Sequence, residues 1–271
     1  YEGWYNVSDE AYVPDGQVVN GCDADSGEPL ERVQEESYFF RLSAFERPLI
    51  EHIRNHPEFI QPDNFRNEIL SFLEGGLKDL SISRTTFTWG VTVPDDPDHV
   101  VYVWIDALTN YISALGYGSD NTELYERYWP ADLHLIGKDI LRFHAIYWPA
   151  LLMAAELPLP RRIQAHGWWT KDGEKMSKSK GNVLDPFELA EHYGVSQLRY
   201  FLLREVPFGQ DGDFSDGAMV RRANEDLAND LGNLLNRTLS MQRKYLGEEV
   251  RSPAVERDED ADLKAHIDAL P

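Results

Sequence analysis

The middle of the chain alternates short strand-like runs with segments of helical spacing. Residues 100–103, 133–136 and 162–165 are short runs, and the first of them is wholly apolar, as in strands buried on both faces of a parallel sheet. Residues 104–115 and the segment from 137 to about 157 carry apolar residues at helical spacing. This order of strands and helices predicts a doubly wound parallel α/β sheet.

The region before this sheet follows other patterns. Residues 1–40 are rich in turns and predict hairpins or a small knuckle. Residues 35–56 and 65–75 have helical spacing, and the second of these segments ends at two glycines. Residues 79–93 carry the β-branched and aromatic residues typical of strands.

From residue 185 onward the pattern is helical. Helices are predicted over residues 186–193, 196–203 and 216–246, and the last of these is polar on one face, as in a helical bundle. The acidic stretch 256–262 predicts a loop between helices. We therefore expect an all-helical region after the parallel sheet.

The composition is that of a globular protein, with 42% hydrophobic and 12% aromatic residues. No apolar run approaches the roughly 18–20 residues that a membrane-spanning helix needs. The single cysteine, Cys22, cannot form an internal disulfide, which favours a reducing, cytoplasmic location. Because the first residue is Tyr1 rather than Met, we expect the chain to be part of a longer protein.

The net charge of −21 opposes nucleic-acid binding, which requires a basic surface. Either the protein does not bind nucleic acid, or its surface is acidic for solubility in high salt and keeps positive charge only where function requires it. Four of the eight lysines fall within residues 171–180, KDGEKMSKSK. Such a loop can bind phosphate oxygens through charge-assisted hydrogen bonds, although a solvated surface loop would have the same composition.

Trp104, Ala107 and Tyr111 share one face of the predicted helix, because they stand at positions i, i+3 and i+7. This face follows a predicted parallel strand, whose carboxyl end is where open α/β sheets bind ligands. A small residue between two aromatic residues would form a flat-walled slot. Ordinary core packing gives the same spacing and is the alternative interpretation.

The next predicted strand leads into a second candidate site. Gly137 lets an anionic or ribose-bearing ligand approach the backbone at a helix N-terminus. Asp139 could accept hydrogen bonds from ribose hydroxyls or cap the helix. Ile140 and His144 share a face of that helix, where a histidine with a purely structural role is the alternative.

His166 and Gly167 end the third predicted strand, where glycine again permits a close approach to the backbone. No zinc spacing is present, because Cys22 has no partner cysteine and the eight histidines are dispersed. The sequence also lacks the Gly-x-x-x-x-Gly-Lys-Ser/Thr and Gly-x-Ser-x-Gly motifs. We therefore predict no metal bound by protein side chains.

Taken together, these segments resemble methionyl-tRNA synthetases, a family of class I aminoacyl-tRNA synthetases. The matching stretches cover nearly the whole chain and are YEGWY (1–5), ESYFFRL (36–42), GLKDLSISR (76–84), VYVWIDALTNYISAL (101–115), LIGKDILRFHAIYWPA (135–150), KMSKSKGNVLDP (175–186) and DLGNLLNR (230–237). Several class I synthetases share KMSKS, whereas the joint presence of VYVW-x-DA and IGKDI-x-x-FH points to the methionine family.

The resemblance implies the second half of a Rossmann-type parallel sheet, with a connective peptide before it and the start of an all-α anticodon-binding bundle after it. We expect the connective-peptide region and the return to the core in residues 1–95 and the Rossmann part in residues 96–170. Residues 171–215 would hold the KMSKS loop and the stem-contact region. Residues 216–271 would begin the anticodon-binding domain.

The resemblance also implies ATP-dependent activation of L-methionine, with Mg²⁺ bound through the nucleotide, and transfer to methionine tRNA. The residues that match the family's methionine pocket are Trp104, Ala107, Tyr111, Ile140 and His144. The residues that match positions around ATP are Gly137, Asp139, His166, Gly167, Trp169 and Lys178.

Lys178 and Lys175 are the expected catalytic residues by the same resemblance. Lys178 would stabilise the triphosphate while the amino acid carboxylate attacks the α-phosphorus. Asn233 and Arg237, at i and i+4, match the family's anticodon-reading residues, since unpaired bases offer edges to such side chains.

The sequence departs from the family pattern in two places. The His-x-Gly-His nucleotide motif is missing, so we expect the 271-residue chain alone to be inactive. Many members also hold zinc in the knuckle, but here Asn6 and Asp9 stand where a Cys-x-x-Cys pair would be. Ser26 occupies a further ligand position near Cys22, and we therefore predict no bound zinc.

Two alternatives stay open at this point. The first is a class I synthetase for leucine, isoleucine, valine or cysteine, against which Trp104 and Tyr111 on either side of Ala107 argue. The second is a non-catalytic tRNA-binding or scaffold fragment, in which the lysine loop only grips phosphate. The sequence does not distinguish a monomer from a homodimer.

Overall fold

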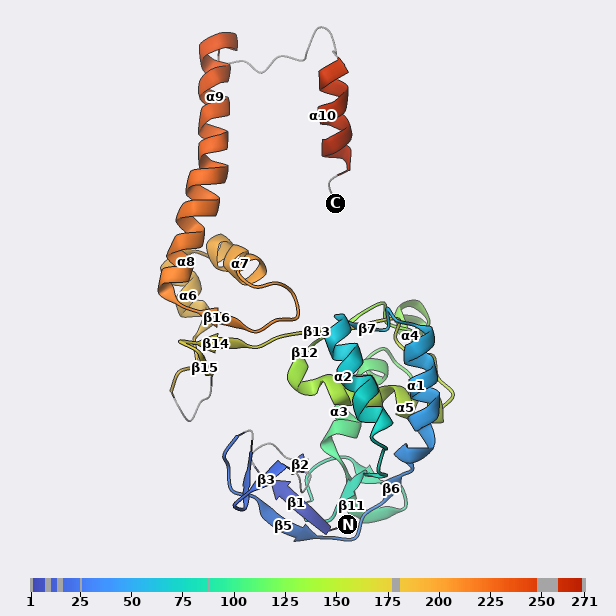
Figure 1. The fold of residues 1–271 in the computed structure, drawn as a ribbon. Coiled ribbons are helices and arrows are strands. Elements are labelled where there is room, and N and C mark those ends of the chain that lie inside the picture. The colour runs from blue at the N-terminus through green and yellow to red at the C-terminus, as the bar shows by residue number, and fades with distance from the viewer. Residues whose placement is uncertain are drawn as a thin grey trace. The chain divides into compact units, whose positions relative to one another are not determined.

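The computed structural model describes residues 2–7, 11–13, 17–24, 26–86, 88–176, 181–247 and 258–269. The chain forms two compact units, whose elements are labelled in Figure 1. Unit 1 comprises Tyr1–Trp168 and Phe208–Asp211, and unit 2 comprises Trp169–Pro207 and Gly212–Pro271. The chain therefore crosses between the units three times, after Trp168, after Pro207 and after Asp211.

Unit 1 begins with small antiparallel sheets. A three-stranded sheet has the order β2-β1-β5, and β3 pairs with β4 in a hairpin. The strands are β1 (Glu2–Asn6), β2 (Ala11–Val13), β3 (Val18–Val19), β4 (Cys22–Asp23) and β5 (Glu31–Gln34). The turn-rich N-terminal region is therefore built of hairpins, as its sequence predicts.

A three-stranded parallel sheet forms the centre of unit 1. Its order is β12-β13-β7, with β7 (Ile60–Gln61), β12 (His134–Gly137) and β13 (Ile163–His166). Ile136 pairs with Ala165 across β12 and β13, and both are buried in the main apolar core. Two of the three predicted parallel strands are thereby confirmed.

The predicted parallel strand at residues 100–103 is wrong in direction. Val100 and Val101 end β11 (Asp96–Val101), which is antiparallel to β9 (Ser83–Arg84) and β10 (Thr92–Val93), and Val103 already begins the next helix. A tight turn at Asp95, with φ of +64°, returns the chain directly onto β10. Such a short connection joins only antiparallel strands, because parallel neighbours need a long crossover.

Helices α1 (Glu46–Asn55) and α2 (Asp63–Glu74) pack against each other and against the parallel sheet (Figure 1). The helix predicted over residues 65–75 is confirmed. The helix predicted over residues 35–56 starts too early, because β6 (Phe39–Phe40) pairs with β8 (Leu80–Ser81) and a 3₁₀ turn, η2 (Leu42–Phe45), precedes α1.

The remaining helices of unit 1 carry the candidate site. Helix α3 (Val103–Ser113) confirms the prediction for residues 104–115, and α4 (Glu123–Tyr128) follows it. After β12 the chain forms a 3₁₀ turn, η3 (Lys138–Ile140), a π-helix, η4 (Phe143–Tyr147), and α5 (Trp148–Ala154). Pro149 has no N–H to donate to the carbonyl four residues earlier, which favours the wider turns of the π-helix.

Unit 2 is a small sheet followed by helices. In the sheet β14 (Trp169–Lys171) is antiparallel to β15 (Glu174–Lys175) and parallel to β16 (Gly212–Phe214). The helices are α6 (Pro186–Tyr193), α7 (Val195–Arg204), α8 (Asp216–Arg222), the π-helix η5 (Ala223–Gly232), α9 (Asn233–Leu246) and α10 (Asp258–Asp268). Leu198, Phe201, Phe214 and Met219 form the apolar core of this unit.

The helices predicted from residue 185 onward are confirmed, and α8, η5 and α9 follow one another without a break in Figure 1. The loop predicted over residues 256–262 is wrong from Asp258, where α10 begins. Among the helices of the described residues, none combines the length and the apolar content of a membrane span.

Candidate active site

Helix α3 presents the first part of the candidate site. The Trp104 ring stacks on Phe143 of η4, with centroids 3.7 Å apart and planes 13° from parallel. Trp104 and Tyr111 are partly buried, whereas Ala107 between them is exposed. The arrangement is therefore two aromatic walls on one helix face with an open, small residue between them.

A hydrogen-bonded histidine joins α3 to η4. The Tyr111 hydroxyl lies 2.8 Å from Nε2 of His144, and Nδ1 of His144 lies 3.0 Å from the carbonyl oxygen of Ile140. Because a carbonyl can only accept, Nδ1 carries the proton and Nε2 accepts from the tyrosine hydroxyl. His144 is only 2% exposed, and burial lowers its pKa, so the ring is neutral.

The structure therefore brings into contact Tyr111 and His144, two of the residues that the family resemblance assigns to a methionine pocket. His144 also approaches the backbone carbonyl of Ile140, and Trp104 stacks on Phe143, the residue that precedes His144. Ala107 lies on the same face of α3. Neutral, aromatic and polarisable groups dominate, as suits an apolar or thioether side chain.

The sequence did not indicate three further aromatic residues that lie in the same cluster as Tyr111. The ring of His134 lies 4.2 Å from that of Tyr111, and Trp148 and Trp129 complete the cluster. Burial, and to a lesser degree His144, lowers the pKa of His134 to about 4. The contacts join separate elements, so helical spacing alone could not reveal them.

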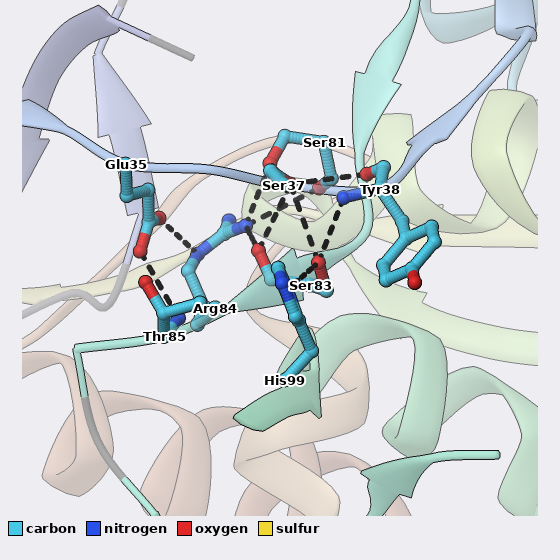
Figure 2. A network of polar contacts seen from close by, with 8 residues as sticks. All are labelled: Glu35, Ser37, Tyr38, Ser81, Ser83, Arg84, Thr85 and His99. Atoms are coloured by element: carbon cyan, nitrogen blue, oxygen red, sulfur yellow. Dashed lines mark hydrogen bonds and ion pairs between the residues drawn. The ribbon is translucent and has the colours of Figure 1, made fainter. Parts of the chain in front are cut away.

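A buried polar network braces the start of α3 (Figure 2). Nε of Arg84 lies 3.6 Å from Oε1 of Glu35, and both side chains are 2% exposed. Arg84 donates to the carbonyl of Ser83 at 2.7 Å, and its guanidinium lies 4.2 Å from the ring centroid of Tyr102, the residue that precedes α3. Tyr102, immediately before α3, is thus held against β9.

The same network ties the connecting segment 35–38 to the sheet. Ser37 and Ser81 hydroxyls are 2.6 Å apart, and the backbone N–H of Tyr38 donates to Ser83 Oγ at 2.9 Å. Ser83 Oγ in turn lies 3.0 Å from Nδ1 of His99 (Figure 2). The bond to Ser83 occupies the backbone N–H of Tyr38, which favours an extended rather than a helical segment before β6.

The turns after β12 and β13 form the second part of the candidate site. Gly137 ends β12, and a Cβ there would collide with Oδ1 of Asp139. The Asp139 carboxylate is exposed, and the indole Nε1 of Trp168 lies 3.4 Å from its Oδ1. Asp139 therefore lies open to solvent at the carboxyl end of the parallel sheet.

The turn after β13 is closed by a neighbouring segment. Nδ1 of His166 donates to the carbonyl of Gly167 at 2.8 Å. A Cβ at Gly167 would collide with the backbone carbonyl of Gln210. The group that lies close to the Gly167 backbone is therefore the Gln210 carbonyl of the same chain.

The remaining candidate residues lie in unit 2. The Trp169 ring packs 5.5 Å from Phe201 in the apolar core of that unit. Lys175 is exposed in β15, and Lys178 lies outside the described residues. Asn233 and Arg237 are exposed on α9, one turn apart.

The knuckle positions are joined by hydrogen bonds. Nδ2 of the buried Asn6 lies 3.5 Å from Ser26 Oγ and 3.4 Å from Asp23 Oδ2, next to Cys22. Asp9 lies outside the described residues. An amide and a hydroxyl do not fit a structural zinc site, which takes thiolates and imidazoles. In the part of the chain that the structure describes, no three His, Cys, Asp or Glu residues are grouped to hold a metal.

The comparisons with known proteins define the class. The family model described as "tRNA synthetases class I (M)" matches residues 17–239. The chain therefore belongs to the class I tRNA synthetases, and its fold of a parallel sheet with flanking helices is the one predicted from the sequence.

The relatives narrow the class to its methionine branch. Methionine–tRNA ligases of Brucella suis and Mycobacterium tuberculosis are 58% and 57% identical over 99% and 100% of this chain, which in each case spans 53% of the relative. The ligase of Caldanaerobacter subterraneus is 56% identical over 97% of this chain and 41% of its own length. The chain thus spans about half the length of the curated relatives it matches.

Solved structures show the same likeness. The Mycobacterium tuberculosis methionyl-tRNA synthetase in complex with methionyl-adenylate superposes with a TM-score of 0.90 at 56% identity, over 99% of this chain and 54% of that one. Its apo form gives a TM-score of 0.87 at 53% identity, with 99% and 53% covered.

Proposed function

We propose that a protein carrying this chain activates L-methionine with ATP and transfers it to methionine tRNA. The observation that carries the proposal is the buried, neutral His144, which is hydrogen-bonded to Tyr111 beside the Trp104 ring. This lining offers a thioether aromatic contacts and no net charge. The relatives are named methionine–tRNA ligases, and one of them binds methionyl-adenylate.

Amino-acid-dependent exchange of pyrophosphate into ATP tests this proposal. The assay uses the full-length protein that carries the chain, with methionine, leucine, isoleucine, valine and cysteine offered in turn. Exchange with methionine alone is the expected result. Exchange with one of the other amino acids would instead favour a synthetase for that residue.

The ATP site would comprise the turns at Gly137, Asp139 and His166–Gly167, with Mg²⁺ bound through the nucleotide. Lys178 and Lys175 would stabilise charge on the triphosphate. Substitution Lys178→Ala should lower the rate of exchange by about a hundredfold or more, as loss of a transition-state charge contact does. Lys78→Ala, a change of an exposed lysine in unit 1, is the matched control and should leave the rate unchanged.

Asn233 and Arg237 would read the anticodon from the exposed face of α9. Arg237→Ala should raise the KM for methionine tRNA in aminoacylation and leave pyrophosphate exchange unchanged. Arg243→Ala, six residues further along the same helix, is the control. Equal effects of the two substitutions would refute a specific role for Arg237.

The chain alone should support neither exchange nor tight tRNA binding. The scaffold alternative requires the opposite, namely tight, salt-dependent binding of tRNA by the isolated chain. We also propose that the knuckle holds no zinc, and elemental analysis that finds stoichiometric zinc would refute this. The single cysteine favours a cytoplasmic location, which cell fractionation would test.

A further inference from the structure

The segment Phe208–Asp211, which we refer to as the strap, contacts residues that follow each of the three parallel strands. Gly209, with φ of +88°, approaches Pro62 after β7 so closely that a Cβ would lie 2.5 Å from the proline Cγ. The carbonyl of Gln210 fills the space beside Gly167 after β13. Asp211 reaches Lys138 after β12.

Asp211 joins the two turns that form the candidate nucleotide site. Its Oδ2 lies 2.6 Å from Nζ of Lys138, and its Oδ1 accepts the backbone N–H of Trp168 at 2.8 Å. Nζ of Lys138 also lies 4.2 Å from the centroid of the Trp168 ring. One carboxylate therefore fixes a side chain that follows Gly137 and a backbone that follows Gly167.

The ionised form of Asp211 is the one that makes these contacts. The hydrogen bond from Lys138 and the backbone N–H of Trp168 hold the pKa of Asp211 below its usual value. Trp168 is the last residue of unit 1 before the chain first leaves it, and Asp211 is the last residue before the chain leaves it again. The hydrogen bond between Trp168 and Asp211 therefore joins the last residues of two segments of unit 1.

We propose that Asp211 is a positioning residue for ATP: through Lys138 and the Trp168 backbone it holds both turns at the carboxyl ends of β12 and β13 in the geometry that binds the nucleotide. The inference rests on the proposed function. In this account Gly167 lacks a side chain because the strap passes there.

The amino ends of the same strands offer a matched control. Arg161 and Asp132 form an ion pair of the same length, 2.6 Å, just before β13 and β12. Both side chains are largely exposed, and such pairs contribute little to stability. Asp132→Asn removes an equivalent charge without touching the strap.

The test measures the KM for ATP and the KM for methionine in pyrophosphate exchange by the full-length protein, together with the thermal unfolding temperature. Asp211→Asn should raise the KM for ATP by about tenfold, the loss expected for a charge-assisted hydrogen bond. The KM for methionine should stay within about twofold of wild type. Asp211→Glu keeps the charge and should recover part of the ATP affinity, and Asp132→Asn should change neither constant.

A purely structural brace would give a different result. If Asp211→Asn lowers the unfolding temperature and moves both KM values equally, or moves the KM for ATP no more than Asp132→Asn, the positioning role is refuted. Wild-type protein without methionine-dependent exchange would overturn the proposed function and this inference together. Wild-type activity with an unaffected Asp211→Asn variant would overturn this inference alone.

Discussion

The two polar neighbourhoods of unit 1 are built in opposite ways. Tyr111 and His144 are neutral, are 33 positions apart in the sequence and share a hydrogen bond in a mostly buried aromatic cluster. Lys138 and Asp211 are charged, remain partly exposed and are 73 positions apart in the sequence. The first neighbourhood suits an uncharged side chain, whereas the second suits a charged nucleotide.

The two sites keep their geometry by different means. Close packing and a single tautomer of His144 fix the aromatic site, because a buried ring has few alternative partners. The charged site lies at exposed turns and is fixed by a strap that returns from a distant part of the chain. Changes at the two sites should therefore affect different substrates.

The largest expected effect concerns acid unfolding of the aromatic site. Burial lowers the pKa of His134 to about 4. The imidazole of His134 therefore binds a proton more readily in the unfolded state than in the folded state. Its contribution is complete above the unfolded pKa of about 6.5 and is lost as pH falls through 4. Between those values the free energy of unfolding should fall by about 3 kcal/mol because of His134.

Denaturant unfolding measured from pH 7 to pH 4 checks this prediction. His134→Phe should flatten the pH dependence, since phenylalanine fills similar space and does not titrate. His266→Phe, at an exposed position of α10, is the control and should leave the slope unchanged. An unchanged slope in the His134 variant would show that this ring does not resist protonation in the folded protein.

The second prediction is that a change in the aromatic site affects the KM for methionine and not the KM for ATP. His144→Ala removes the acceptor of the Tyr111 hydroxyl and opens a cavity, so the KM for methionine should rise by about a hundredfold, or about 2.7 kcal/mol. The KM for ATP should change little. His52→Ala, on α1 in the same unit, is the control in the same exchange assay.

The third effect concerns the strap. Gly167→Ala places a methyl group against the Gln210 carbonyl, and the strain should raise the KM for ATP by roughly 30-fold, or about 2 kcal/mol. Gly217→Ala is the control, because a Cβ there meets no atom and alanine favours helix α8. If both substitutions leave the KM for ATP unchanged, the strap does not shape the nucleotide site.

The smallest effect is the stability that Asp211 adds. Because its pKa is lowered in the folded state, its contribution is present above the unfolded pKa of about 3.9 and is lost as pH falls through the folded pKa. The side chain is 45% exposed, so the contribution should stay below about 1 kcal/mol. Comparing Asp211→Asn with wild type at pH 6 and pH 3 measures it, and a larger loss at pH 3 would contradict the sign.

Helical spacing predicted which residues share a face of α3, whereas their assignment to a methionine pocket came from the family resemblance and stays a prediction. Trp104, Ala107 and Tyr111 lie on one helix, α3, as predicted, whereas Ile140 ends η3 and His144 lies in η4 rather than on one continuous helix. His144 still lies within hydrogen-bond distance of the Tyr111 hydroxyl and of the Ile140 carbonyl. The direction of β11 escaped prediction, because an apolar run does not reveal which neighbour it pairs with.

The contact between Lys138 and Asp211 could not be predicted from the local sequence pattern. Gly137 ends β12, and Asp139 and Gly167 follow β12 and β13, and the sequence indicates such turns. Nothing in the local pattern links Asp211 to Lys138, since long-range contacts leave no periodic signal. The role of Lys178 stays a prediction, because this residue lies outside the described part of the chain.

The most direct test of the account measures the KM for methionine and the KM for ATP in pyrophosphate exchange by the full-length wild-type, His144→Ala and Gly167→Ala proteins. We expect a crossed pattern, in which His144→Ala raises the KM for methionine and Gly167→Ala raises the KM for ATP. Equal changes of both constants in both variants would contradict it.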